Sequence, residues 1–564
     1  MLDFIVTNTR IADLFRLRLF DGWVGIRNGR FVYVEAGSVP EDMQAEHVLD
    51  ASNMILVPGL IDAHMHIESS LITPRRFAEA VLPWGTTTIL SDPHEVGNVA
   101  GEAGVKWMID ASRNLPLRIL HSIPSCVPAT SPEIEWTGDV FDANTIASLA
   151  QEDSVIALGE VMDYMGLLGM NPRLQQIVLQ AKKSGLLIEG HIPTLSGTDL
   201  SQYLAHGVSS DHTLTFADKI HEQISKGVVV MLQTKSITPE NIAVVLDLAD
   251  PSRVLLITDD IEPTLLQEGH LSRMVELAIS VGMPTLSAFA AASLYPARYL
   301  GQRDTGAIAP GYHADFMLLK DLNTFPPEAV YVSGKLIAEQ GKLQTTIRAE
   351  YPPLPDYPAV PAQIQIGQFR ITEADDNRQI TANIVALQNK KITLTKLETS
   401  LIQLRDGYPQ FDDDDELAIA AILARNGKSY FAGLIKNTGL KAGAFASTVA
   451  HDSHNLLVIG RNPESMLTAA QGVSDIGGGV VIARDNEIIT QLELPYFGLL
   501  SDEPVPIVAH QLDTLQSALR ELGVDHARPF LTLSIMGLSV SPYVKFTDKG
   551  IIDTEKRQLL PLIS

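Results

Sequence analysis

Short apolar runs alternate with helix-like sequence between about residue 57 and residue 300. Eight such runs can be counted, each ending in a polar residue: 57–64, 86–92, 117–122, 156–160, 186–191, 207–212, 228–233 and 254–259. Strands buried on both faces of a parallel sheet are apolar almost throughout, as these runs are. Eight strands that each precede a helix, over roughly 250 residues, predict a (β/α)8 TIM barrel. The alternative, a Rossmann sheet, would show Gly-x-Gly-x-x-Gly after its first strand, and that motif is absent there.

The sequence on either side of this barrel, which we place at 58–300, has a different pattern. Residues 1–57 and 301–350 contain short β-segments and turns, and we expect them to pair as one small discontinuous β domain. A proline-rich linker follows at 351–361. Residues 362–564 contain further apolar strands and are predicted to form an additional C-terminal α/β domain, in which the acidic run 412–416 is a solvated loop or a helix start.

Composition and charge exclude several classes of protein. Apolar residues make up 45% and charged residues 19% of the 564 residues, which is typical of a well-packed globular protein. The net charge of −25 repels phosphate backbones, so we expect no nucleic-acid partner. Cys126 is the only cysteine, which excludes an internal disulfide and every cysteine-rich metal motif. Neither a signal peptide nor an apolar run of roughly 18 residues is present, so we expect a cytoplasmic protein with no membrane partner.

Most of the eight runs end on side chains that can bind a metal ion or move a proton. His64 and His66 end the first run, and they face the same way because residues two apart in a strand lie on one face. The carboxyl ends of barrel strands converge on one mouth, where active sites lie. The residues expected there are His64, His66, Asp92, His94, Glu160, His191, His212 and Asp259.

Each of these residues alone has a simpler explanation. A single histidine at a strand end is more often a hydrogen-bonded polar residue than a ligand, and an aspartate there often caps the next helix. The spacing favours a metal site, because Asp62 to Leu158 spans 96 residues, or three βα units of about 32, and later candidates lie on strands five, six and eight. The predicted ligands are His64, His66, Glu160, His191, His212 and Asp259.

The types of ligand restrict the metal. Imidazoles and carboxylates without thiolates suit Zn²⁺, Fe²⁺ or Mn²⁺. Six ligands are too many for one tetrahedral site, so we predict two divalent ions bridged by the carboxylate of Glu160. Such a pair polarises the target and activates water as hydroxide near neutral pH.

Several motifs resemble those of a known family. Residues 58–66, Pro-Gly-Leu-Ile-Asp-Ala-His-Met-His, are similar to the opening motif of the amidohydrolase superfamily. Other stretches resemble the adenine deaminases in particular, at 66–70, 91–96, 158–160, 451–455, 476–479 and 501–504. The resemblance covers almost the whole chain, including a C-terminal domain that most members of the superfamily lack.

This resemblance implies a role for each candidate. His64 and His66 would hold one metal ion, His191 and His212 would hold the other, and Glu160 would bridge the two.

The catalytic proton shuttle implied by the resemblance is Asp259, which would also bind metal. Some residues would lie around the mouth, in contact with the substrate, in support of the ligands, or as ligands of an auxiliary metal: Glu68, Ser69, Asp92 and His94. His451 and His454 either reach the active site from the C-terminal domain or belong to an ordinary loop.

The resemblance implies hydrolytic deamination of adenine to hypoxanthine and ammonia, an activity of purine salvage. It also implies a homo-oligomer, a dimer, whose partner is a small purine-like substrate. Two positions depart from the family pattern. The family usually has Ser-Asp-His-Glu at 210–213, where this chain ends the motif with Thr213. It usually has Arg-Glu-Gly-Ser at 233–236, where this chain reads Gln-Thr-Lys-Ser and has Lys235 in place of the glycine. Because both lie at the mouth, the alternative is an amidohydrolase for another purine, a pterin or a cyclic amide. A non-catalytic metal-binding paralogue is the other alternative, and the complete ligand set argues against it.

Overall fold

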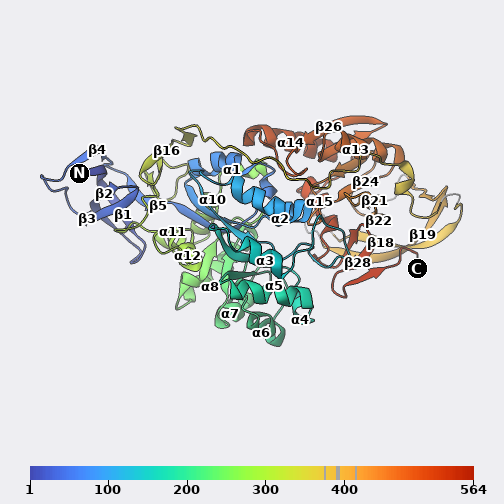
Figure 1. Cartoon of the computed structure of the whole chain (residues 1–564), viewed down its shortest axis with the longest axis horizontal. Coiled ribbons are helices and arrows are strands. Elements are labelled where there is room, and N and C mark those ends of the chain that lie inside the picture. The colour runs from blue at the N-terminus through green and yellow to red at the C-terminus, as the bar shows by residue number, and fades with distance from the viewer. Residues whose placement is uncertain (374–375, 389–393, 413–415, 564) are drawn as a thin grey trace.

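The computed structural model describes residues 1–564 except 374–375, 389–393, 413–415 and 564. Figure 1 shows an elongated molecule in which the barrel lies between a β-rich region at the N-terminal end and a larger C-terminal domain. Three of the five residues of the acidic run, 413–415, lie outside the described residues.

The central barrel consists of eight strands: β6 (Leu60–Met65), β7 (Thr86–Ser91), β8 (Arg118–Ile123), β9 (Val155–Val161), β10 (Leu187–Gly190), β11 (Ser210–Asp211), β12 (Val229–Leu232) and β13 (Val254–Leu256). Strands β6 to β10 pair in chain order in one parallel sheet, and β11 to β13 form a second. A parallel bridge between Met65 and Asp259 links the last strand back to the first. The (β/α)8 barrel predicted from the alternating pattern is confirmed.

Strands β11 and β13 are two and three residues long, much shorter than the six-residue runs 207–212 and 254–259 that predict them. The carboxylate of Asp211 accepts hydrogen bonds from the backbone N–H groups of Ile192 and Thr213, and so takes donors that a strand ladder would use. The carboxylate of Asp62 binds the backbone N–H of Thr258 in the same way beyond the end of β13. Buried carboxylates therefore bind backbone groups at the points where β11 and β13 end, near the mouth of the barrel.

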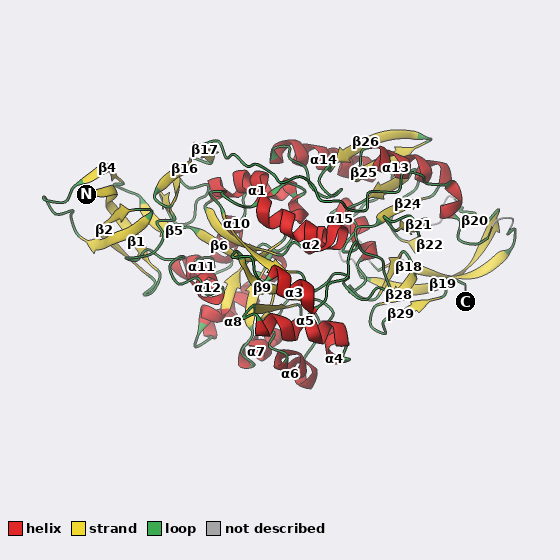
Figure 2. Cartoon of the chain, viewed as in Figure 1, coloured by secondary structure: helices red, strands yellow, loops and turns green. Residues whose placement is uncertain are grey.

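Helices cover the outside of the barrel strands (Figure 2). In α5, the side chain of Asn171 caps the first turn, Pro172 occupies the first helical position, and the apolar face packs inward through Leu174 and Ile177. No helix in the described part of the chain has the length and apolar character needed to cross a membrane. The barrel helices are α1 (Pro74–Val81), α2 (His94–Ala111), α3 (Ala143–Leu149), α4 (Tyr164–Leu168), α5 (Pro172–Lys183), α6 (Gly197–Ala205), α7 (Ala217–Ser225), α8 (Pro239–Asp247), α9 (Pro263–Leu266), α10 (Leu271–Ser280), α11 (Thr285–Ala291) and α12 (Leu294–Tyr299).

Strands from both sides of the barrel form a single sheet at the N-terminal end. Strand β5 pairs antiparallel with β14, so that Pro58 lies opposite Phe316. Gly59 then leads from this sheet into the barrel, and a Cβ at this position would lie 2.3 Å from Thr87 Oγ1, which only glycine avoids. The predicted first run is therefore divided between two sheets. The strands are β1 (Leu2–Asp13), β2 (Arg18–Arg27), β3 (Arg30–Ala36), β4 (Ala45–Asp50), β5 (Ile55–Pro58), β14 (Phe316–Leu319), β15 (Ala329–Val332), β16 (Lys335–Glu339) and β17 (Lys342–Leu343).

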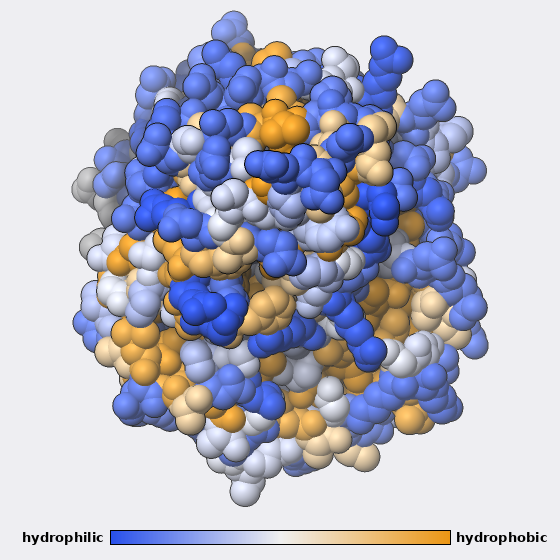
Figure 3. Space-filling model, turned by 90° about the vertical axis from the view of Figure 1, so that its left-hand side faces the viewer, coloured by the Kyte–Doolittle hydropathy of each residue, from blue (hydrophilic) through white to orange (hydrophobic). Residues whose placement is uncertain are grey.

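The face of the molecule at this end is mostly polar, with apolar side chains in small separate patches (Figure 3). Single exposed apolar residues of this kind are normal on a protein surface.

The C-terminal domain follows residues 351–361, which have no regular secondary structure. It contains a nine-stranded sheet, a three-stranded sheet and three α-helices, as far as its described residues go. Its elements are β18 (Gln379–Leu387), β19 (Thr395–Arg405), β20 (Tyr408–Pro409), β21 (Leu417–Leu423), β22 (Tyr430–Lys436), β23 (Ala444–Ser447), β24 (Leu456–Gly460), α13 (Pro463–Asp475), β25 (Gly479–Arg484), β26 (Glu487–Glu493), α14 (Val505–Glu521), α15 (Pro529–Ser534), β27 (Val544–Thr547), β28 (Gly550–Asp553) and β29 (Gln558–Leu560).

A polar contact and a shared apolar core join the C-terminal domain to the barrel. Asp502 accepts hydrogen bonds from Thr73 Oγ1 at 2.7 Å and from the Tyr351 hydroxyl at 2.9 Å, and it forms an ion pair with Arg75. Apolar side chains of both domains, such as Phe77 and those of α14, belong to one continuous buried cluster. The 501–504 motif therefore lies at the domain interface, and it fixes the C-terminal domain against α1.

Candidate metal centre

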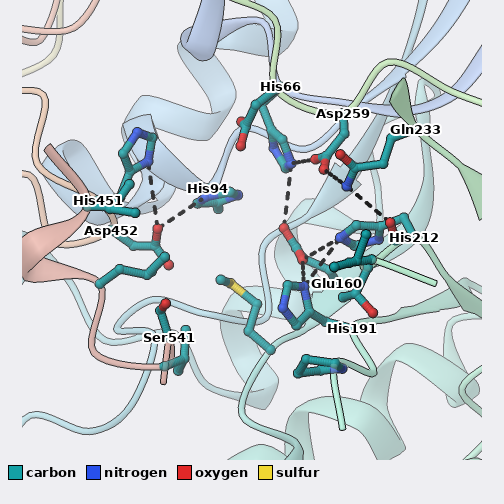
Figure 4. Close-up of a pocket in the computed structure, with 18 of the residues that line it drawn as sticks. His66, His94, Glu160, His191, His212, Gln233, Asp259, His451, Asp452 and Ser541 are labelled. Atoms are coloured by element: carbon teal, nitrogen blue, oxygen red, sulfur yellow. Dashed lines mark hydrogen bonds and ion pairs between the residues drawn. The ribbon is translucent and has the colours of Figure 1, made fainter. Parts of the chain in front are cut away.

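A cavity of about 320 Å³ opens at the carboxyl ends of the barrel strands, a size suited to a small organic molecule. Figure 4 shows imidazoles and carboxylates of the barrel that point into it, with residues of the C-terminal domain opposite. The barrel side includes His66, His94, Glu160, His191, His212, Gln233, Asp259 and Asp260. The C-terminal side includes His451, Asp452, Leu531, Ile535, Leu538, Val540, Ser541 and Pro542.

Glu160, near the end of β9, lies between the histidines of three other strand ends. Its Oε2 atom is 2.6 Å from His191 Nδ1 and 3.1 Å from His212 Nε2. Its Oε1 atom is 3.5 Å from His66 Nε2 (Figure 4). Each carboxylate oxygen thus faces a different group of imidazoles, an arrangement that suits a carboxylate shared by two ions.

Asp259 completes the group from the end of the eighth strand. Its Oδ1 atom is 3.5 Å from His66 Nε2 and 3.9 Å from His64 Nε2, while Oδ2 accepts a hydrogen bond of 2.7 Å from Gln233 Nε2. The backbone of Asp259 is in the left-handed region, with φ of 60°. This conformation costs a non-glycine residue about 1–2 kcal/mol, and it persists at functional sites where the surroundings enforce it.

The ring orientations of His64 and His66 are fixed by acceptors behind them. His64 Nδ1 lies 3.1 Å from the buried Glu189 Oε2, and His66 Nδ1 lies 3.1 Å from the backbone oxygen of Asp92. When Nδ1–H donates to these oxygens, the lone pair of Nε2 points into the site, as in metal-binding histidines. The buried Nε2 of His64 has no hydrogen-bond partner among the described residues, so a metal ion would satisfy it.

Charges within the group also fit a cation. Burial alone would raise the pKa of Glu160, but the adjacent His212 and His191 hold it well below its usual range. Burial would lower the pKa of His212, yet Glu160 beside it raises this pKa to about 9. The carboxylate of Glu160 thus holds a proton on His212 in place of a cation, and metal binding would release that proton. The donor set therefore fits divalent metal ions.

Two family models together match most of the chain. The Amidohydrolase family matches residues 55–337, and the Adenine deaminase C-terminal domain matches residues 392–558. Adenine deaminase 2 of Carboxydothermus hydrogenoformans is 36% identical, over 99% of this chain and 97% of its own. Adenine deaminase of Clostridium perfringens is 33% identical over 99% of both chains, and that of Nitratidesulfovibrio vulgaris is 36% identical over 98% of this chain and 95% of its own.

The chain belongs to the adenine deaminase family. The resemblance noted from the sequence motifs is confirmed, and so is the prediction of a metal-dependent hydrolase that acts on C–N bonds.

The remaining candidates of this adenine deaminase family member lie at different depths. His94 lines the cavity, whereas Asp92 lies behind it and accepts a hydrogen bond of 3.2 Å from the backbone N–H of Glu160. Glu68 is fully buried, and it accepts a hydrogen bond from the backbone of Val96. The hydroxyl of Ser69 donates a hydrogen bond to the carboxylate of Asp260. Asp92, Glu68 and Ser69 therefore support the site from behind, and only His94 of the four lines the cavity.

The two positions that depart from the family pattern both line the cavity. The hydroxyl of Thr213 donates to Asp211 at 2.9 Å and accepts from Lys219 Nζ at 2.7 Å, so its polar group is already engaged. Lys235 is exposed at the rim.

Sequence reasoning missed several residues of the site. Glu189 stands two positions before His191, and Gln233 ends the seventh run, so both carried a strand-end signal that could have identified them. The apolar residues of the C-terminal wall carried no such signal, because their place depends on how two domains pack together.

Proposed function

We propose that this protein catalyses the hydrolytic deamination of adenine to hypoxanthine and ammonia. The observation that carries the proposal is the composition of the cavity, whose walls come from an amidohydrolase barrel and from the adenine deaminase C-terminal domain. Relatives that carry the name adenine deaminase match both halves of the chain over nearly its full length. A substrate held in the cavity would therefore touch both domains.

Two divalent ions are proposed for the barrel side of the cavity. His64 and His66 would hold one, His191 and His212 the other, and Glu160 would lie between them. Mn²⁺, Fe²⁺ and Zn²⁺ all accept imidazole and carboxylate ligands. When bound, such ions polarise the bond under attack and lower the pKa of water.

Asp259 is proposed to move the proton. Gln233 Nε2 holds Oδ2 of the carboxylate, which leaves Oδ1 directed at the histidines and able to accept a proton from the attacking water. The same atom would then deliver that proton to the departing amino group, as general base and then general acid. Its position beside the proposed ligands would bring this proton close to the C–N bond under attack.

The C-terminal wall would bind the flat purine ring. Leu531, Ile535, Leu538 and Val540 provide apolar surface opposite the carboxylates and histidines. Apolar surface on one side and a few convergent polar groups on the other are typical of small-molecule sites.

Thr213 and Lys235 favour the second candidate, an amidohydrolase acting on a different heterocycle, because these residues replace those usual at the mouth. Protein loaded with Mn²⁺ should be tested on adenine, other purines, pterins and cyclic amides, with ammonia release and ultraviolet spectra as readouts. We expect adenine to be turned over with the highest kcat/KM. A higher value for a pterin or a cyclic amide would support the second candidate.

Restoring the usual family residues is expected to raise adenine turnover. In the double variant Thr213→Glu/Lys235→Gly, the glutamate introduced at position 213 is longer than threonine and can extend past Asp211 toward the cavity. The second substitution removes the ammonium group of Lys235 from the rim. One added hydrogen bond to a charged group corresponds to about a tenfold gain in kcat/KM. Steady-state kinetics of the parent, both single variants and the double variant would measure it. An unchanged kcat/KM would mean that these positions do not set the preference for adenine.

A further inference from the structure

A second group of metal-ligating side chains lies where the C-terminal domain meets the barrel. Glu95 belongs to the first turn of α2, while His451 and His454 belong to the loop between β23 and β24. Their ligand atoms all lie within 4.8 Å of one another. None of the three is among the six metal ligands predicted from the sequence.

Two distances within this group match those between neighbouring ligand atoms of one metal ion. Glu95 Oε1 is 3.5 Å from His451 Nδ1, and Glu95 Oε2 is 3.5 Å from His454 Nε2. Metal–ligand bonds of about 2.0–2.2 Å in tetrahedral geometry place neighbouring ligand atoms about 3.3–3.6 Å apart. The same distances are too long for good hydrogen bonds.

Two of these side chains are buried with unpartnered polar atoms. Glu95 is 1% exposed and His454 is fully buried, and neither Glu95 Oε2 nor His454 Nε2 has a hydrogen-bond partner among the described residues. A buried polar atom without a partner costs about 1–3 kcal/mol, and more when it is charged. A cation between the two atoms would satisfy both.

The conformation of His454 is set by groups behind it. Its Nδ1 atom lies 3.2 Å from the backbone oxygen of Thr448, and its own backbone oxygen accepts a 2.6 Å hydrogen bond from the buried Arg425. The backbone nitrogen of Ala450 also lies 3.3 Å from Nδ1. In the tautomer that donates Nδ1–H to Thr448, the lone pair of Nε2 faces Glu95, as in a metal-bound histidine. The backbone of His454 is left-handed, with φ of 52°, a conformation that is uncommon outside functional sites and turns.

We propose that Glu95, His451 and His454 bind a third divalent metal ion, separate from the pair in the barrel. Two imidazoles and a carboxylate at tetrahedral spacing suit Zn²⁺, with water from the cavity as the fourth ligand, because His451 also lines the cavity. The ion fastens the loop 448–455 of the C-terminal domain to α2 and thereby holds His451 and Asp452 in the cavity wall (Figure 4). The ion positions this wall and takes no part in the reaction itself.

Metal content measures this site without reference to activity. Full-length protein would be stripped by chelation, loaded with Zn²⁺, desalted, and measured by mass spectrometry of the metal. We expect Glu95→Gln and His454→Asn to hold one equivalent of Zn²⁺ per chain less than the parent, three falling to two. The control His510→Gln, at an exposed histidine of α14, should keep the parent's content.

Both variants are chosen to keep the fold. Glutamine has the shape of glutamate, and asparagine tolerates a positive φ and can still donate to Thr448. Equal Zn²⁺ content in the parent and in both variants would overturn the third site. A parent with one equivalent and variants with none would support the third site and contradict the ion pair, so the two proposals fail separately.

Discussion

The Glu160→Ala variant is expected to lose both ions at the barrel mouth, and adenine turnover with them. Glu160 is the carboxylate that reaches His66 with one oxygen and both His191 and His212 with the other. Without it, His191 and His212 lose the carboxylate beside them, and Asp259 is left as the carboxylate next to His66. Loss of the several kcal/mol that metal ions contribute to catalysis corresponds to about a 1000-fold or greater fall in kcat.

Metal analysis and ammonia release on the same preparation would measure both effects. His64→Ala removes a buried side chain that is proposed as a metal ligand, and should also lower metal content and activity together. Glu240→Ala, at an exposed glutamate of α8, is the matched control and should behave as the parent does. Parental metal content in Glu160→Ala would show that this carboxylate does not bridge the ions.

The Asp259→Asn variant is expected to fold normally and to lose at least about 100-fold in kcat, the order that a positioned acid–base group contributes. Asparagine is among the residues most tolerant of the left-handed backbone found here, and its amide preserves the size of the side chain. What it loses is the ability to take up and return a proton. Circular dichroism would report the fold, and steady-state ammonia release would report kcat.

The neighbouring residue provides the control for this variant. Asp260 also lines the cavity, but its Oδ1 atom is bonded to Ser69. Asp260→Asn should therefore reduce kcat much less than Asp259→Asn does. A near-parental kcat in Asp259→Asn, with a large loss in Asp260→Asn, would assign the proton shuttle to Asp260.

The barrel could be predicted from the sequence because its signal is local. Each apolar run contains a buried strand, and the polar residues that end runs four to eight line the cavity. The points where β11 and β13 end could not be predicted, because Asp211 and Asp62 form hydrogen bonds there with backbone groups of other segments. Such bonds exist only once the barrel has closed.

The C-terminal wall of the cavity could not be predicted from the sequence, and neither could the cluster of Glu95, His451 and His454. These side chains come together through the packing of two domains, and no spacing along the chain records that contact. The sequence left open whether His451 and His454 reach the active site or belong to an ordinary loop. In the structure His451 lines the cavity, while His454 is buried behind it.

Adenine turnover by metal-loaded protein is the most direct test of the proposed activity. Parent protein with its metal content measured would be given adenine, and ammonia and hypoxanthine would be quantified over time by an enzymatic assay and by chromatography. We expect equimolar ammonia and hypoxanthine, with formation of both abolished by chelation and in Glu160→Ala. Metal-replete parent protein that releases no ammonia from adenine, while it hydrolyses another heterocycle, would contradict the proposed activity.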